Sequence, residues 1–203
     1  MARALERLFT IEDWLAYQGE GDTRYELVDG RLVAMDPPKA WHGDIQAEIA
    51  RICSVALRDR FPCRVRVEAG IEVRREPKPR GFTADLAVTC EPIDENRPTM
   101  AEPRLVIEVG SPSTDTIDKF EKLQAYMTLP TVEEIWLVWS TSRFVLQAVR
   151  GPEGWGEPRG FIGEASFHSP VLGVTVALAD IYRFTPLGRT EPESDFDPAD
   201  LDD

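Results

Sequence analysis

Short runs of apolar residues, separated by polar and proline-containing segments, predict strands along most of the chain. The first two runs, Tyr25–Val28 and Arg31–Met35, flank the dipeptide Asp29-Gly30. Both residues of this dipeptide tolerate the positive φ angles of a type I′ turn, so the segment predicts a β-hairpin. Their apolar or alternating pattern predicts further strands at 64–73, 82–89, 105–109, 134–139, 144–149 and 171–178.

Two longer segments are predicted to be helical. In the first, apolar residues recur at steps of three and four and predict a helix over 41–60, which ends before Pro62; they are Ile45, Ile49, Ile52, Ala56 and Leu57. His42 lies in the first turn of this helix. A second helix is predicted over 116–129, because serine, threonine and aspartate precede it as caps. Short helices are predicted after Thr10 and over 179–184.

The order of the elements is helix, hairpin, helix, three strands, helix and three strands. This order predicts an α/β protein with helices on the faces of a mixed sheet. A length of 203 residues suits one domain, which we place at 1–187. Residues 191–203 hold seven acidic residues and no basic ones, so 188–203 is predicted to be an acidic, disordered tail. The segment 151–157 is predicted to be a loop.

Composition argues against several classes of protein. The formal net charge of −13 opposes tight DNA binding by an isolated monomer. The three cysteines lack C-x-x-C spacing, which argues against a disulfide framework and against cysteine-bound zinc. No apolar run is long enough to span a bilayer or to form a secretory signal, so we expect a cytoplasmic protein. The sequence has neither a glycine-rich phosphate loop nor a G-x-S-x-G motif.

Three carboxylates stand where the pattern predicts buried side chains. Glu108 lies within Leu-Val-Ile-Glu-Val, Asp85 within Ala-Asp-Leu-Ala-Val, and Glu26 beside Leu-Val. Buried carboxylates are normally paired, hydrogen-bonded or bound to a metal ion. Asp85 and Glu108 fall on consecutive strands, and paired strands lie about 5 Å apart, so one divalent ion is predicted to bind both. Glu26 alone is more often explained by a strand edge or a pairing arginine.

Six short segments carry a recognisable pattern of residues and follow one another in a fixed order. They are Arg-Tyr-Glu-Leu-Val-Asp-Gly (24–30), Pro-Pro (37–38) with His42, Ala-Asp-Leu-Ala-Val (84–88), Val-Ile-Glu-Val-Gly-Ser-Pro-Ser-Thr (106–114), Asp-Lys-Phe-Glu-Lys-Leu-Gln-Ala-Tyr (118–126) and Ser-Pro-Val-Leu-Gly (169–173). Together they resemble the Uma family of restriction-endonuclease-like proteins, a branch of the PD-(D/E)XK nuclease superfamily. The resemblance runs from residue 10 to residue 184.

The resemblance implies a restriction-endonuclease-like domain with its active site on two neighbouring strands. It matches Asp85 and Glu108 to the two acids of the superfamily motif, and Glu26 and His42 to positions that line the site. Ala84 stands where the family usually has proline, and Gly110 stands where the superfamily has its lysine. In this family the lysine comes from the following helix, where the matching residue is Lys122.

The helical periodicity of 116–129 favours a different lysine from the one that the resemblance implies. Its apolar face is marked by Ile117, Phe120, Leu123 and Met127. Lys122 lies about 100° from that face, and Lys119 lies closer to it. A long lysine side chain can still reach around the helix, so Lys122 stays the first candidate, as the resemblance implies, and Lys119 is the alternative.

The resemblance implies a Mg²⁺-dependent endonuclease, with Mn²⁺ as a substitute. Asp85, Glu108 and the backbone carbonyl of Val109 would hold the ion, and DNA would be the substrate. The acidic charge then calls for a homodimer that presents a basic groove, for which Arg74, Arg75, Lys78 and Arg80 are candidates. Two alternatives stay open: a non-catalytic interaction or scaffold protein that retains the nuclease fold, and a hydrolase of small phosphate esters.

Overall fold

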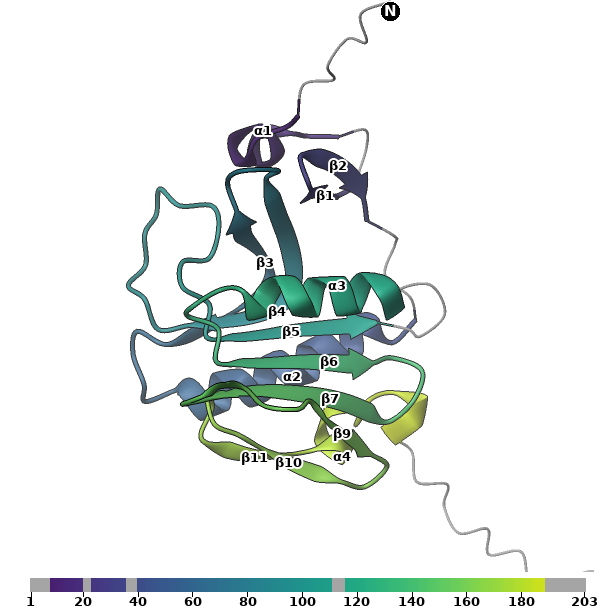
Figure 1. The fold of residues 1–203 in the computed structure, drawn as a ribbon. Helices are drawn as coiled ribbons and strands as arrows, with labels where there is room; N and C mark the ends of the chain where they lie inside the picture. The colour runs from purple at the N-terminus through teal and green to yellow at the C-terminus, as the bar shows by residue number, and fades with distance from the viewer. Residues whose placement is uncertain (1–7, 20–22, 36–39, 111–115, 189–203) are drawn as a thin grey trace, which may run out of the picture.

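A large mixed β-sheet runs through the structure, and helices cover both of its faces (Figure 1). The structure is a computed structural model that describes residues 8–19, 23–35, 40–110 and 116–188, with backbone alone at 116–119. The helices are α1 (Ile11–Ala16), α2 (His42–Leu57), α3 (Thr116–Met127), α4 (Leu178–Ile181) and the 3-10 helix η1 (Pro186–Gly188). The strands are β1 (Tyr25–Val28), β2 (Arg31–Ala34), β3 (Arg64–Arg74), β4 (Arg80–Thr89), β5 (Leu105–Gly110), β6 (Glu134–Trp139), β7 (Phe144–Gly151), β8 (Gly154–Trp155), β9 (Arg159–Ile162), β10 (Ser166–Ser169) and β11 (Val174–Ala177).

The sheet is mixed because one of its connections crosses over. Its order is β2-β1-β4-β5-β6-β7-β8, with β3 paired to β4 and β9 paired to β7. Strands β5 and β6 are parallel, while β4–β5 and β6–β7 are antiparallel. Parallel neighbours need a long crossover, and α3 supplies it between β5 and β6. Strands β10 and β11 form a separate, two-stranded antiparallel sheet. The predicted α/β class, with a mixed sheet flanked by helices, is confirmed.

Two layers of core side chains lie on the two faces of the sheet. Helix α2 packs its apolar stripe, from Ile45 to Leu57, onto the face that carries Ile107. Helix α3 packs Leu123 and Tyr126 onto the opposite face. Strands β5 and β6 are buried along almost their whole length, as a continuous apolar run predicts for central strands.

The N-terminal hairpin forms as predicted and attaches to the edge of β4. Asp29 has φ 49° and Gly30 has φ 80°, which are the positive angles of the expected turn. Helix α1 lies over the junction, and the indole of Trp14 rests on Gly81 of β4. A Cβ atom at Gly81 would lie 2.4 Å from the Trp14 ring, so this close approach requires glycine.

The second half of the chain departs from the predicted elements. Strands β9 and β10 were not predicted, and β8 lies within the segment predicted to be a loop. These strands are short; β8 and β9 are largely exposed, and β10 buries Phe167 as its one apolar side chain, so they carry little apolar pattern. The predicted strand 171–178 is limited to Val174–Ala177, because the preceding residues form a buried turn. Helix α4 begins and ends earlier than the predicted segment 179–184.

The prediction that the cysteines do not pair is wrong. Cys63 and Cys90 form a disulfide, and Cys53 is a buried free thiol. The antiparallel register of β3 and β4 pairs Arg64 with Thr89, which brings the two flanking cysteines face to face. Disulfides are rare in reducing compartments, so this bond weighs against the cytoplasmic location, which stays a prediction. Among the helices of the described residues, none has the length and apolar character needed to cross a membrane.

The carboxylate of Glu134 ties β6 to the chain segment before β11. Glu134 is fully buried and accepts hydrogen bonds from Trp136 Nε1 at 2.6 Å and Gln147 Nε2 at 2.7 Å. Its other oxygen accepts from the Ser169 hydroxyl at 2.8 Å and from the Val171 N–H at 3.2 Å. The late Ser-Pro-Val-Leu-Gly segment is therefore held in place by a buried acid, which is a structural role.

Replacing Glu134 with alanine is expected to destabilise the fold by about 3 kcal/mol or more, because several buried donors lose their acceptor. Urea unfolding followed by circular dichroism measures this change. The neighbouring Glu133→Ala is the matched control: its partly exposed pair with Arg104 should contribute less than about 1 kcal/mol. Equal losses for the two variants would contradict this role of Glu134.

Candidate active site

Asp85 and Glu108 lie opposite each other where β4 and β5 separate. The last pair of this ladder joins Leu86 to Ile107, and one further step of the register sets Asp85 against Glu108. The carboxylate of Asp85 then takes the place of a strand partner, since its Oδ2 accepts the backbone N–H of Val109 at 2.5 Å. Both acids are buried, as predicted from their apolar surroundings.

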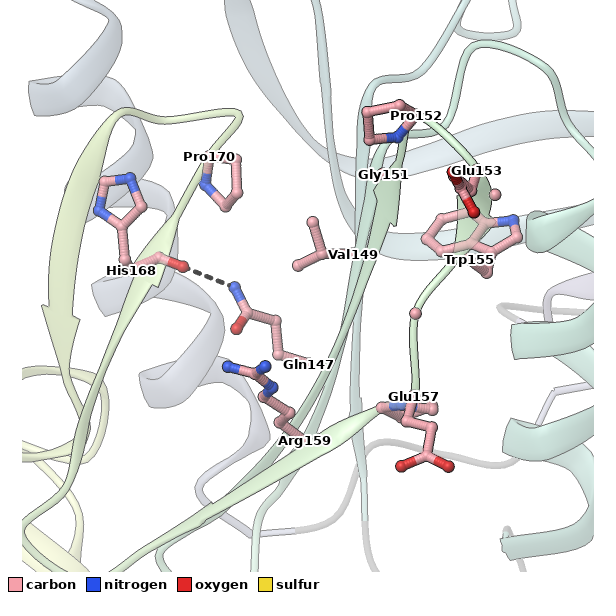
Figure 2. A pocket seen from close by; sticks show the side chains of 13 residues that line it. Gln147, Val149, Gly151, Pro152, Glu153, Trp155, Glu157, Arg159, His168 and Pro170 are labelled. Atoms are coloured by element: carbon pink, nitrogen blue, oxygen red, sulfur yellow. Dashed lines mark hydrogen bonds between the residues drawn. The ribbon is translucent and has the colours of Figure 1, made fainter.

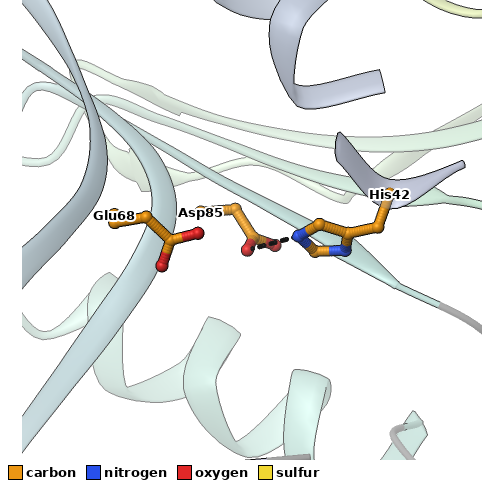
Figure 3. Close-up of side chains that lie close together, drawn as sticks. All are labelled: His42, Glu68 and Asp85. Carbon is orange, nitrogen blue, oxygen red and sulfur yellow. Dashed lines mark ion pairs between the residues drawn. The ribbon is translucent and has the colours of Figure 1, made fainter. Parts of the chain in front are cut away.

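The second oxygen of Asp85 faces the start of α2. His42 Nε2 lies 3.0 Å from Asp85 Oδ1, and Gln46 Nε2 donates to the same oxygen at 3.2 Å. The Gln46 amide also donates to Glu68 Oε1 at 3.1 Å. Figure 3 shows Asp85 between His42 and Glu68, and one potential ligand atom from each of the three lies within 4.8 Å of the others. His42 thus reaches the site, as the family resemblance implied.

Glu68 and Gln46 were missed by the sequence analysis. The β3–β4 register brackets Glu68 between two paired neighbours and sets it opposite Asp85. Its φ of 52° is left-handed, a conformation that costs a residue with a side chain about 1 kcal/mol or more. An acidic residue in a partly polar strand does not by itself indicate a functional site. Only the strand register would have indicated that Glu68 lies beside Asp85.

Lys122 of α3 is buried and pairs with an acid of β1. Its Nζ lies 2.8 Å from Glu26 Oε1 and 4.0 Å from Glu108 Oε2. The Thr83 N–H donates to the same oxygen of Glu26 at 3.1 Å. Lys122, which the family resemblance matched to the site, therefore lies beside two of the acids.

The apolar face predicted for α3 is wrong at Phe120. Phe120 is 43% exposed, whereas the buried side chains of the helix include Lys122, Leu123 and Tyr126. The helix turns two polar residues inward because both find carboxylate partners there. Met127 is partly buried against the core, as predicted, whereas the side chains of Ile117 and Lys119 lie outside the described ones.

Tyr126 contacts the second carboxylate of the motif. Its hydroxyl donates to Glu108 Oε1 at 2.7 Å. Burial, together with the neighbouring Glu108, raises the pKa of Tyr126 well above its ordinary value, so the hydroxyl keeps its proton. The Phe82 ring meets the Tyr126 ring edge to face at 5.8 Å and lies 5.6 Å from Lys122 Nζ.

Negative charge exceeds positive charge around Glu108. Burial raises the pKa of Glu108 to about 8; the ammonium of Lys122 opposes this shift, and Asp85 and Glu26 add to it. Among the described side chains, Lys122 lies beside Glu26 and Glu108, and His42 lies beside Asp85. A divalent cation would offset negative charge in this cluster.

The donor set of the site suits a hard cation. Asp85, Glu108 and the Val109 carbonyl offer the oxygen ligands that Mg²⁺ prefers, and Mn²⁺ accepts the same set. The closest group of potential metal ligands in the described part of the chain differs from the predicted pair of acids. It consists of His42, Glu68 and Asp85, and it does not include Glu108. An ion shared by Asp85 and Glu108 stays a prediction.

The arginines of the candidate basic groove form ion pairs within the chain. Arg74 and Arg80 both pair with Asp29, and Arg75 pairs with Glu12 and Glu72. The positive charges of these arginines are therefore largely compensated within the chain.

A separate hollow lies between β7 and the segments that follow it (Figure 2). Its lining includes Trp155, Arg159 and His168, and the Gln147 amide donates to the His168 carbonyl at 2.8 Å. It shares no residue with the carboxylate cluster.

Comparisons with known proteins agree on the class of fold. The profile of the Uma2 family, described as "Putative restriction endonuclease", matches residues 11–179. "Uncharacterized protein slr1290" of Synechocystis sp. is 27% identical over 132 residues, which are 64% of this chain and 68% of that protein. A crystal structure described as "a putative nuclease belonging to DUF820", from Anabaena variabilis, has a TM-score of 0.69 at 17% identity and covers 86% of this chain and 97% of that one. This likeness confirms the predicted restriction-endonuclease-like fold.

Metal-free protein is expected to lose stability as the pH rises from about 4.5 to about 8. Over this range folded Glu108 holds a proton that it releases on unfolding, because burial raises its pKa. One such proton changes the unfolding free energy by about 1 kcal/mol per pH unit. Urea unfolding at pH 5, 6.5 and 8 should show a shallower slope for Glu108→Gln than for the exposed control Glu121→Gln. Parallel slopes for the two variants would show that Glu108 ionises normally.

Proposed function

Since this chain belongs to the Uma2 family, we propose that it is a metal-dependent endonuclease that hydrolyses phosphodiester bonds of nucleic acid. The observation that carries the proposal is the meeting of Asp85 and Glu108 at the point where their strands separate, with a buried lysine beside them. Two acids and a lysine in this arrangement can bind a cation and stabilise the negative charge of a reacting phosphate.

Asp85 and Glu108, with the Val109 carbonyl, would hold Mg²⁺ or Mn²⁺. When bound, such an ion supplies Lewis-acid polarisation of the phosphate and lowers the pKa of a water ligand. Asp85 is fixed for this role by the Val109 N–H and by the Gln46 amide, both of which donate to its carboxylate. A ligand oriented in this way loses little entropy on binding the ion.

Lys122 would hold a proton at Nζ, where it orients the attacking water or balances charge on the phosphate. Its contact with Glu26 at 2.8 Å keeps the ammonium in place. His42 would contact the phosphate or carry a proton, since its imidazole lies at the edge of the site against Asp85. Each of these roles uses a polar side chain that the fold has already brought to the cluster.

DNA is the proposed substrate, and charge is the main obstacle to its binding. A chain with a net charge of −13 repels a polyanion, so affinity should be weak and should depend strongly on salt. We propose that the protein acts as a homodimer, in which two sites on one duplex add their affinities. A cytoplasmic location belongs to the same proposal, although the Cys63–Cys90 disulfide weighs against it.

Conversion of either acid to its amide should abolish metal-dependent cleavage. We expect Asp85→Asn and Glu108→Gln each to lower the rate by about 100-fold or more, because each removes a charged ligand of the ion. Calorimetry with Mn²⁺ should show weaker binding by both variants, while Glu121→Gln should match the wild type. Plasmid, single-stranded DNA, RNA and a chromogenic phosphodiester would be compared as substrates.

Each result of this comparison has a distinct meaning. Cleavage of the chromogenic diester alone would indicate a hydrolase of small phosphate esters. No binding of Mn²⁺ at millimolar concentration and no cleavage would favour a scaffold that retains the fold.

The two lysines of α3 can be separated by one pair of variants. Lys122→Met should lower kcat by about 100-fold while leaving Mn²⁺ affinity undiminished, because the lysine acts on the reacting groups and not on the ion. Lys119→Met is the matched control and should retain activity. Loss of activity in Lys119→Met alone would reverse the assignment.

A further inference from the structure

We infer that Tyr126 is a positioning residue for the proposed reaction: its hydroxyl holds one oxygen of Glu108 and so leaves the other oxygen directed at Lys122 and the metal position. The inference rests on the proposed function, and it assigns a role to a residue that lies in the segment 118–126 of the resemblance but was given no role there.

The two oxygens of Glu108 have different partners. Oε1 accepts the Tyr126 hydroxyl at 2.7 Å, whereas Oε2 lies 4.0 Å from Lys122 Nζ. A carboxylate without such a contact can rotate and present either oxygen. With Oε1 occupied, Glu108 offers a cation a single oxygen in a fixed direction, as orienting hydrogen bonds do for metal ligands in general.

The position of the hydroxyl is set by packing and not by Glu108 itself. The Tyr126 side chain is completely buried, and its ring meets the Phe82 ring edge to face at 5.8 Å. Tyr126 follows Lys122 by one helical turn, so one side of α3 carries both donors. They reach acids on two different strands, Glu108 on β5 and Glu26 on β1.

A second buried tyrosine provides the contrast. The Tyr182 hydroxyl contacts the carbonyls of Trp139 at 2.8 Å and Phe144 at 2.9 Å, and accepts the Phe144 N–H at 3.2 Å. Its partners are backbone groups. Removing this hydroxyl therefore disturbs the fold without touching a carboxylate, which makes Tyr182→Phe the matched control.

The test compares Mn²⁺ binding by wild type, Tyr126→Phe and Tyr182→Phe, measured by calorimetry and by electron paramagnetic resonance of the bound ion. Tyr126→Phe keeps the ring and should weaken Mn²⁺ binding by about 10-fold or more. The Mn²⁺ concentration for half-maximal cleavage should rise by the same factor, with kcat at saturating metal changed less. Tyr182→Phe should bind Mn²⁺ like the wild type, even where its unfolding midpoint is lowered.

Wild-type affinity in Tyr126→Phe, or an equal loss in Tyr182→Phe, overturns the inference and leaves the proposed function intact. Wild-type protein that binds no Mn²⁺ overturns the proposed function and this inference with it. If Tyr126→Phe alone does not fold, the same substitution is made in Glu108→Gln, where no buried charge is left unpaired. There it should not alter residual Mn²⁺ affinity, and a further loss would show that the hydroxyl acts through another group.

Discussion

The burial of several carboxylates around Lys122 is the constraint on which this structure depends. Glu26, Asp85 and Glu108 come from three strands, and burial raises the pKa of Glu108, with the charges of Asp85 and Glu26 adding to the shift. A charge removed from water is tolerated only where partners replace the water. The fold supplies such partners from every side: a backbone N–H of β5, an amide of α2, and an ammonium and a hydroxyl of α3. The restriction-endonuclease-like sheet is thus the scaffold that assembles these partners.

Much of the fold was predictable because most elements carry their own pattern. The Asp29-Gly30 turn and the apolar runs of β5 and β6 need no knowledge of the rest of the molecule. Strands β9 and β10 could not be predicted from their own residues, because they lie at the margin of the fold and are defined by their pairing with other strands. The Cys63–Cys90 bond is of the same kind, because it follows from the register of two strands and not from the spacing of cysteines along the chain.

The residues of the candidate site also fall into those that the sequence indicates and those that only the fold brings together. Asp85, Glu108 and Glu26 are visible in the sequence as acids within apolar runs, so their burial could be predicted. The inward face of α3 could not, because its periodicity was judged from apolar residues alone, and Phe120 is exposed while Lys122 is buried. Glu68 and Gln46 come from segments whose approach to Asp85 is decided only in the folded chain. The resemblance to a family pointed to Lys122, which the structure places beside Glu26 and Glu108, and its role in the site stays a prediction.

Helix α3 has two tasks that are usually separate. It is the crossover that allows β5 and β6 to run in the same direction, and it brings a lysine to the acids at the end of β5. Gly110 stands where the resemblance to the superfamily implies a strand lysine. Under the proposed function, the crossover helix supplies the amino group from outside the strand, since its path already carries Lys122 over the acids. Proteins of this architecture that lack the strand lysine need not be inactive remnants.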